Sequence, residues 1–172
     1  DRPMAVAGVE HAPDGAPATF RDPEMQSRFV HDGIVGFPAL GPDDLARIEV
    51  LHRARSATEG PAFAPDFAAA DRSLVAETTT LARELLDPVI ERVFADHRIC
   101  FATLVVKDVG DSSGMEPHDD RSYVDERRHR ALTVWVPTID TSPEIDNGCL
   151  HVVPGSHRLA TSPAGSNTPD WY

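Results

Sequence analysis

Hydrophobic positions recur at helical spacing in three stretches of the first half of the chain. The first helix is predicted to begin at Asp22-Pro23 and to end before Gly33, because an N-cap aspartate, a proline at the first position and a terminal glycine mark helix ends. A second helix is predicted to open at Gly41-Pro42-Asp43-Asp44, and a third over Ser73 to Asp96. The apolar stripe of the third helix consists of Leu81, Leu85, Val89 and Val93, with Pro88 marking a kink or restart.

Strand-like runs dominate the second half of the chain. Cys100 to Val106 (CFATLVV), Ala131 to Val136 (ALTVWV) and Cys149 to Val153 (CLHVV) are apolar and rich in β-branched residues. A shorter strand, Ile34 to Phe37, is expected after the first helix. Helices followed by strands predict an α+β fold, with helices against one face of a mainly antiparallel sheet.

Two stretches show no hydrophobic period. Residues 1–21 mix proline, glycine, alanine and acidic residues and predict a loose N-terminal arm. The stretch from Gly60 to Ala70 predicts a loop. The remaining residues, 22–172, are expected to form a single domain, since the length of the chain supports one sizeable core.

Composition narrows the classes of partner. The formal net charge of -12 disfavours nucleic acids and anionic membranes, which are bound mainly through Lys and Arg. No apolar run approaches the roughly 20 residues needed to span a bilayer, and no signal peptide is visible. We therefore expect a soluble, cytoplasmic protein that acts on a small molecule. Cys100 and Cys149 are expected to be free thiols, with a disulfide as the unsupported alternative.

A polar loop after the first long strand contains the candidate chemistry. In the triplet His118-Asp119-Asp120, the first and third side chains of an extended chain point to one side, so that an imidazole and a carboxylate can converge on one ion. Two histidines and one carboxylate form the facial triad that binds Fe(II). Roughly one such triplet is expected by chance in a chain of this composition. The alternative is an Asp-rich surface loop in which His118 makes only a hydrogen bond.

The surroundings of this triplet resemble the core of the phytanoyl-CoA dioxygenase-like family. The resemblance covers Phe101 to His157 and rests on the order and spacing of TLVVKDVG, Pro-His-x-Asp, LTVWVPTID and NGCLHVVPGSH. The segment FVHDGIVGF is similar to the opening helix and strand of the family. The family is a group of Fe(II)- and 2-oxoglutarate-dependent oxygenases, so the resemblance implies a double-stranded β-helix (jelly-roll, cupin-like) core with flanking N-terminal helices.

The resemblance also assigns site residues. His118 and Asp120 match the proximal histidine and the carboxylate among the iron ligands, and are the implied catalytic residues. Thr103 falls where the family lines the 2-oxoglutarate pocket, and Trp135 matches an aromatic residue beside that co-substrate. Without the resemblance, Thr103 is an ordinary strand residue and Trp135 a core residue. Further histidines in the matched region, His151 and His157, are expected to be structural.

The chain departs from the family pattern after the PGSH turn. No histidine follows His157, and Arg158 is the only arginine there, so the distal iron ligand and the arginine that pairs with 2-oxoglutarate are not found. We expect the oxygenase domain to be incomplete at its C-terminus. Activity of these 172 residues by themselves is accordingly in doubt.

The implied reaction combines 2-oxoglutarate and O2 to oxidise an unactivated C–H bond. A carboxylate at Asp120, where related halogenases have a small residue, favours hydroxylation. A locally basic loop follows the iron motif, and within it Arg121, Tyr123 and Arg127 are weak candidates for binding a substrate acid; a solvated loop is the alternative. We expect a small acid, an amino acid or a secondary-metabolite intermediate as substrate. The competing hypotheses are a cupin-like metal enzyme without 2-oxoglutarate and a non-catalytic binding domain.

Overall fold

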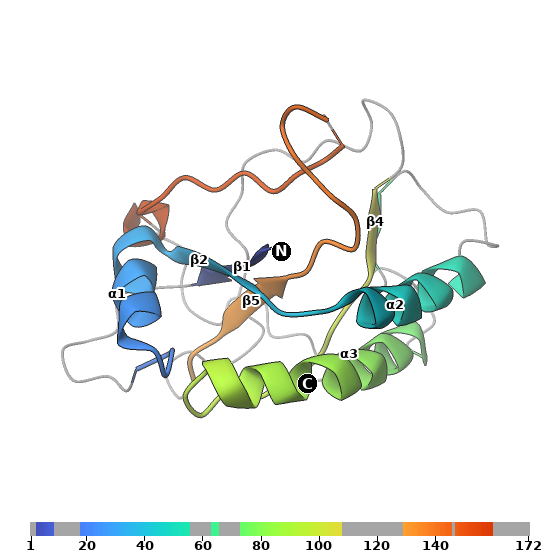
Figure 1. Ribbon diagram of the computed structural model, residues 1–172, viewed down its shortest axis with the longest axis horizontal. Helices are drawn as coiled ribbons and strands as arrows, with labels where there is room; N and C mark the ends of the chain where they lie inside the picture. Colours follow the sequence, from blue (N-terminus) through green and yellow to red (C-terminus); the bar gives the residue numbers. More distant parts are fainter. Residues whose placement is uncertain are drawn as a thin grey trace. The chain divides into compact units, whose positions relative to one another are not determined.

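The computed structural model describes residues 3–8, 18–55, 63–65, 73–107, 129–145 and 147–159. These residues form a mixture of helices and strands (Figure 1). The chain divides into two compact units, and each unit combines separate stretches of sequence. The first contains β1, α1, β2, β5 and the 3-10 helix η3, and the second contains α2, β3, α3 and β4.

The first unit is built on a three-stranded antiparallel sheet with the order β2-β1-β5. Its strands are β1 (Pro3–Gly8), β2 (Ile34–Pro38) and β5 (Leu132–Trp135). The loose arm expected for residues 1–21 is not what the structure shows at residues 3–8, which form the middle strand. The reason is nonlocal, because the ladder partners of β1 come from two distant parts of the sequence.

Helix α1 (Pro23–Asp32) packs beside β2 and confirms the predicted helix ends (Figure 1). The Asp22 side chain accepts a hydrogen bond from the Met25 backbone N–H at 2.8 Å, and Gly33 ends the helix in the left-handed conformation. Phe20 and Phe29 meet edge to face with ring centroids 5.2 Å apart. Phe20 and Val35 are almost completely buried, so the core of this unit lies between the N-terminal segment, α1 and the sheet.

The second unit is dominated by two helices, α2 (Pro42–Arg55) and α3 (Ser73–Val93), which lie side by side (Figure 1). The Arg47 guanidinium on α2 forms an exposed ion pair with the Glu84 carboxylate on α3. Of the stripe predicted for α3, Leu85 and Val89 are buried, and Leu81 and Val93 are half-buried. Pro88 lies inside the helix without ending it.

Two short strands complete the second unit. β3 (Phe63–Pro65) pairs antiparallel with β4 (Val105–Lys107). β3 lies within residues 60–70, which were predicted to be a loop. The other residues of that stretch are outside the described part of the chain. Both cysteines are free, as expected, and both are half-buried. None of the helices that the structure describes is long and apolar enough to cross a membrane.

Two predicted strands differ from the structure. Of Cys100 to Val106, only the end is in β4, and Cys149 to Val153 forms no strand. β-branched residues supply the propensity for extended backbone, but a strand also requires a neighbouring ladder. Within the described residues the segment before β4 is hydrogen-bonded to side chains of α3 instead.

Candidate functional site

The predicted iron ligands lie outside the described residues. This holds for His118 and Asp120, and equally for the substrate candidates Arg121, Tyr123 and Arg127. Within the described ranges, no three His, Cys, Asp or Glu side chains come together as a metal site. The assignment of these five residues therefore stays a prediction, and the described geometry concerns the elements on either side of them in sequence.

Thr103 lies two residues before β4, in a segment of the second unit that is neither helix nor strand. Its side chain is half-buried. The backbone immediately before it is held by α3. The Thr79 hydroxyl accepts a hydrogen bond from the Ala102 N–H at 3.0 Å and donates one to the Ala102 carbonyl at 3.3 Å. One turn further along α3, the Arg83 guanidinium donates to the carbonyls of Ile99 and Cys100 at 3.1 and 3.2 Å.

Trp135 is the last residue of β5 and is half-buried. Its backbone lies opposite Ala5 of β1 in the antiparallel register. Strand β5 is thus positioned by the central strand of the first unit, which fixes the backbone that carries the indole. Thr103 belongs to the second unit and Trp135 to the first.

Arg130 has structural partners. Its guanidinium donates hydrogen bonds to the Thr19 hydroxyl at 3.2 Å and to the Ala18 carbonyl at 3.3 Å. Thr19 is buried, so this contact ties the start of β5 to the N-terminal segment of the same unit. Of the basic loop after the iron motif, Arg130 is the arginine that the structure describes, and it is engaged in packing.

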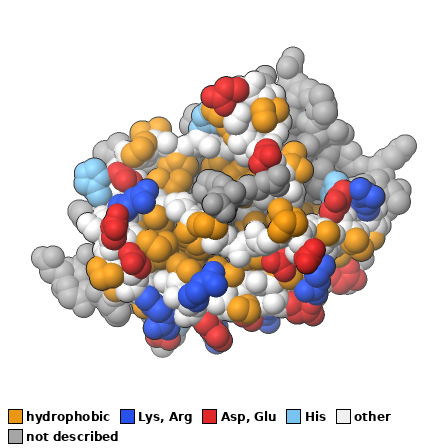
Figure 2. Space-filling view, viewed as in Figure 1, with side chains coloured by type: hydrophobic (Ala, Val, Ile, Leu, Met, Phe, Trp, Pro, Cys, Tyr) orange, Lys and Arg blue, Asp and Glu red, His pale blue; other side chains and the backbone are white. Residues whose placement is uncertain are grey.

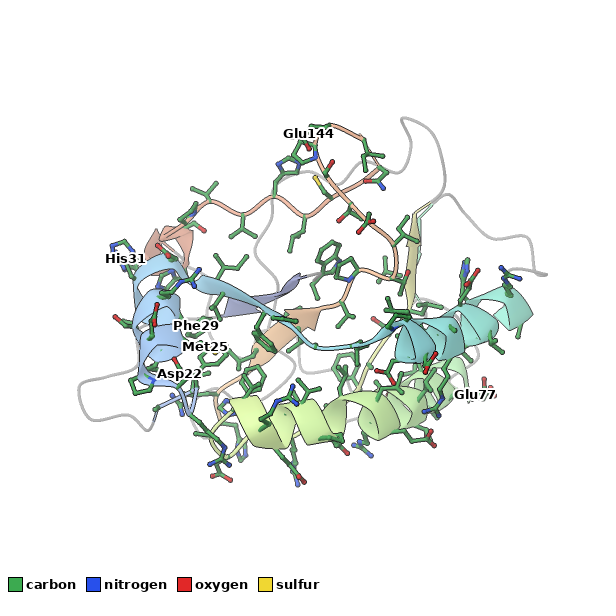
Figure 3. All side chains as sticks on the ribbon, in the orientation of Figure 1. Asp22, Met25, Phe29, His31, Glu77 and Glu144 are labelled. Atoms are coloured by element: carbon green, nitrogen blue, oxygen red, sulfur yellow. The ribbon has the colours of Figure 1, made fainter. Side chains whose placement is uncertain are left out.

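Asn147, the first residue of the NGCL motif, bonds through its side chain to the backbone of the loop that precedes it. Its amide nitrogen donates to the Asp140 carbonyl at 2.6 Å, and its amide oxygen accepts from the Ser142 N–H at 3.2 Å. Glu144 lies at the tip of this loop (Figure 3). Its carboxyl accepts hydrogen bonds from the Ser142 hydroxyl and from the Glu144 backbone N–H, and both lower its pKa. The asparagine of the motif therefore organises a loop through two backbone groups.

The PGSH turn and the following arginine are attached to the C-terminal end of α1. The Gly155 N–H donates to the Asp32 carbonyl at 2.8 Å, and the Arg158 guanidinium donates to the carbonyls of Val30 and His31. These carbonyls belong to the last turn of the helix, which has no intrahelical donors for them. His31 marks this end of α1 in Figure 3, and Asp22 marks the other. The turn thus caps the helix.

A hollow of about 430 Å³ lies along α2 and α3. The hollow is open to solvent. On the face of the molecule drawn in Figure 2, acidic and basic side chains are interspersed with apolar ones. The lining of the hollow contains carboxylates but neither imidazole nor thiol. The lining residues are Leu51, Ala76, Glu77, Thr80, Leu81 and Glu84.

Comparison with known proteins identifies the class. The sequence profile of the phytanoyl-CoA dioxygenase (PhyH) family matches residues 39–171, well over half of the chain. The chain therefore belongs to the phytanoyl-CoA dioxygenase family. Members of this family are typically dioxygenases that use Fe(II) and 2-oxoglutarate, and the family implies a cupin-like fold. Comparisons with curated proteins and with solved structures gave no match.

Several polar contacts that organise these elements have no signal in the sequence. The residues that make these contacts are Thr79, Arg83 and Arg158. Their partners are backbone groups, which any residue type provides, so no sequence pattern marks the pairing. A signal existed in one case: Asn147 begins a motif with Gly148, and asparagine commonly bonds to nearby backbone.

Proposed function

We propose that this chain forms an Fe(II)- and 2-oxoglutarate-dependent oxygenase domain with a double-stranded β-helix core, which hydroxylates an unactivated C–H bond. The observation that carries the proposal is the triplet His118-Asp119-Asp120 inside the region matched by the family. The donor set fits the metal, because an imidazole nitrogen and a carboxylate oxygen are the two kinds of ligand in the facial triad for Fe(II).

In this proposal each residue has a limited role. His118 and Asp120 hold the metal and leave positions open on it. Thr103 offers a hydroxyl to 2-oxoglutarate, and Trp135 packs beside it and excludes water. With Fe(II) bound, the metal would supply the chemistry by which O2 is the oxidant for both substrates: one oxygen atom enters succinate as 2-oxoglutarate loses carbon dioxide, and the other is inserted into the C–H bond to give the alcohol.

The substrate class follows from charge. The chain carries a net charge of -12, while the loop after the triplet is locally basic. An anionic substrate would be repelled by most of the surface and attracted to that loop, where Arg121, Tyr123 and Arg127 can form charge-assisted hydrogen bonds to it. We therefore propose a small acid, an amino acid or a secondary-metabolite intermediate.

Succinate formation in the full-length protein tests the proposal. With Fe(II), ascorbate and 2-oxoglutarate, a screen of small carboxylic acids and amino acids should contain a compound that raises succinate production. His118→Ala and Asp120→Ala should each lower this production by about a hundredfold or more, because each removes a metal ligand. The circular dichroism spectrum should remain unchanged.

Asp119→Ala is the matched control. It removes a neighbouring carboxylate that the proposal does not use as a ligand, because only the first and third side chains of an extended triplet are expected to share a side, and it should keep most of the activity. Wild-type rates in both the His118→Ala and the Asp120→Ala variants would rule out the proposed ligands. Substrate turnover without any succinate would instead favour a cupin-like metal enzyme that does not use 2-oxoglutarate.

A further inference from the structure

The segment just before β4 belongs to neither a helix nor a strand, and it has no strand beside it within the described residues. Ile99 to Leu104 carry no ladder pairing, and β4 begins at Val105. The backbone N–H and C=O groups of a segment outside helices and strand ladders must find partners elsewhere when the segment is half-buried. The half-buried state of Ala102 and Thr103 makes those partners necessary.

Helix α3 supplies these partners through two side chains one turn apart. The Thr79 hydroxyl serves both backbone groups of Ala102, with distances of 3.0 Å to the nitrogen and 3.3 Å to the oxygen. A hydroxyl can do this because it has one donor and two acceptor sites. The Arg83 guanidinium holds the preceding carbonyls, Ile99 and Cys100. We call Thr79 and Arg83 the α3 clasp.

The clasp has a consequence for the next residue. When both backbone groups of Ala102 are fixed, the peptide plane that leads into Thr103 is fixed as well, because the Ala102 carbonyl belongs to that plane. The position of the Thr103 backbone, from which its hydroxyl-bearing side chain starts, is then held by α3. A hydroxyl that binds a ligand must be held to within a fraction of an ångström to contribute fully.

We propose that Thr79 and Arg83 are positioning residues for the 2-oxoglutarate site, acting through the backbone of residues 99–102 on Thr103. This inference rests on the proposed function, since it assumes that Thr103 binds 2-oxoglutarate. It adds residues of a helix, distant in sequence from the iron motif, to the determinants of co-substrate affinity.

Thr79→Val tests the proposal, because valine keeps the shape of threonine and removes the hydroxyl. Amide hydrogen exchange at Ala102 should become at least about tenfold faster. The Kd for 2-oxoglutarate, measured by calorimetry on the full-length protein with Mn(II) in place of iron, should rise by about tenfold. Thr79→Ser keeps the hydroxyl and should restore both quantities to within about twofold of wild type.

Thr80→Val is the matched control. Thr80 is the next residue of α3, is exposed, and its hydroxyl bonds to the Ala76 carbonyl of its own helix at 2.8 Å. It should change neither Ala102 exchange nor the affinity. If Thr79→Val does not fold, Arg83→Gln decides, since Arg83 is exposed; it should raise the Kd severalfold, and Arg92→Gln on the same helix should not.

The outcomes separate the two hypotheses. If wild type binds 2-oxoglutarate and the clasp variants bind it equally well, the positioning role is overturned while the proposed function stands. An equal loss of affinity in Thr80→Val also overturns it, because the effect would then belong to the helix in general. If wild type binds no 2-oxoglutarate, the proposed function fails and this role fails with it.

Discussion

Gly33 combines two requirements at one position. Its φ of 75° places it in the left-handed region, and a Cβ atom built on it would clash with the Nδ1 atom of the His157 ring. The first requirement ends α1, and the second lets the His157 ring approach the backbone of the helix end. Either requirement alone favours glycine. The cost of the left-handed backbone and the cost of the clash with the ring can be measured separately, because only the clash depends on His157.

We predict that Gly33→Ala lowers the free energy of unfolding by about 2 kcal/mol or more, and by only about 1 kcal/mol in a His157→Ala background. The left-handed conformation costs the same in both backgrounds, whereas the clash disappears when the ring is removed. Urea denaturation of the four proteins of this double-mutant cycle measures the difference. Equal losses in the two backgrounds would show that the ring moves aside without cost.

At the scale of elements, α1 is fixed at its two ends by different means. The start is local, since Asp22 caps the N–H of Met25 three residues away. The other end depends on a segment more than 120 residues later in sequence, because Gly155 and Arg158 satisfy carbonyls of the last turn. A cationic side chain at a helix C-terminus also interacts favourably with the helix dipole.

We predict that Arg158→Met lowers the free energy of unfolding by about 1 kcal/mol and speeds exchange of the Gly155 amide, which donates to Asp32. The methionine keeps the length of the side chain but loses the donors. Native-state hydrogen exchange measures the effect at Gly155 directly. Arg28→Met, an exposed change on α1, is the control and should alter stability by less than about 0.5 kcal/mol. An unchanged Gly155 exchange rate in Arg158→Met would contradict the capping role.

At the scale of the whole molecule, the two compact units are interleaved in sequence. The chain enters the second unit after Pro38 and returns to the first before β5. It enters the second unit again for residues 138–150 and then returns to the first. If the second unit unfolded alone, the strands of the first would be joined by long flexible loops. Closing such loops costs entropy, so each unit stabilises the other through the connectivity of the chain.

We therefore predict one cooperative unfolding transition, which is also what a single domain over residues 22–172 requires. Circular dichroism at 222 nm reports mainly on α2 and α3, which have 14 and 21 residues against 10 in α1. In a Trp171→Phe variant, fluorescence reports on Trp135 in the first unit. The two urea midpoints should agree to within about 0.2 M. Separate midpoints would show that the units unfold independently.

The sequence by itself determined the elements whose signals are local. Both ends of α1, the opening of α2 and the apolar stripe of α3 follow from residues within a few positions of each other, because caps, prolines and helical periodicity act over one or two turns. The family could also be predicted from the sequence, because it depends on motifs in a fixed order. The same motifs predict the imidazole and carboxylate ligands of the proposed iron site.

The tertiary structure decided which extended segments became strands and what holds the others. β1 was not predicted because its partners, β2 and β5, are remote in sequence, while Cys100 to Leu104 looked like a strand yet bonds to Thr79 and Arg83. The physical reason is that a strand is completed by another segment's backbone, and backbone groups are the same in every residue. Local sequence therefore specifies that a segment is extended, and only the folded chain specifies its partner.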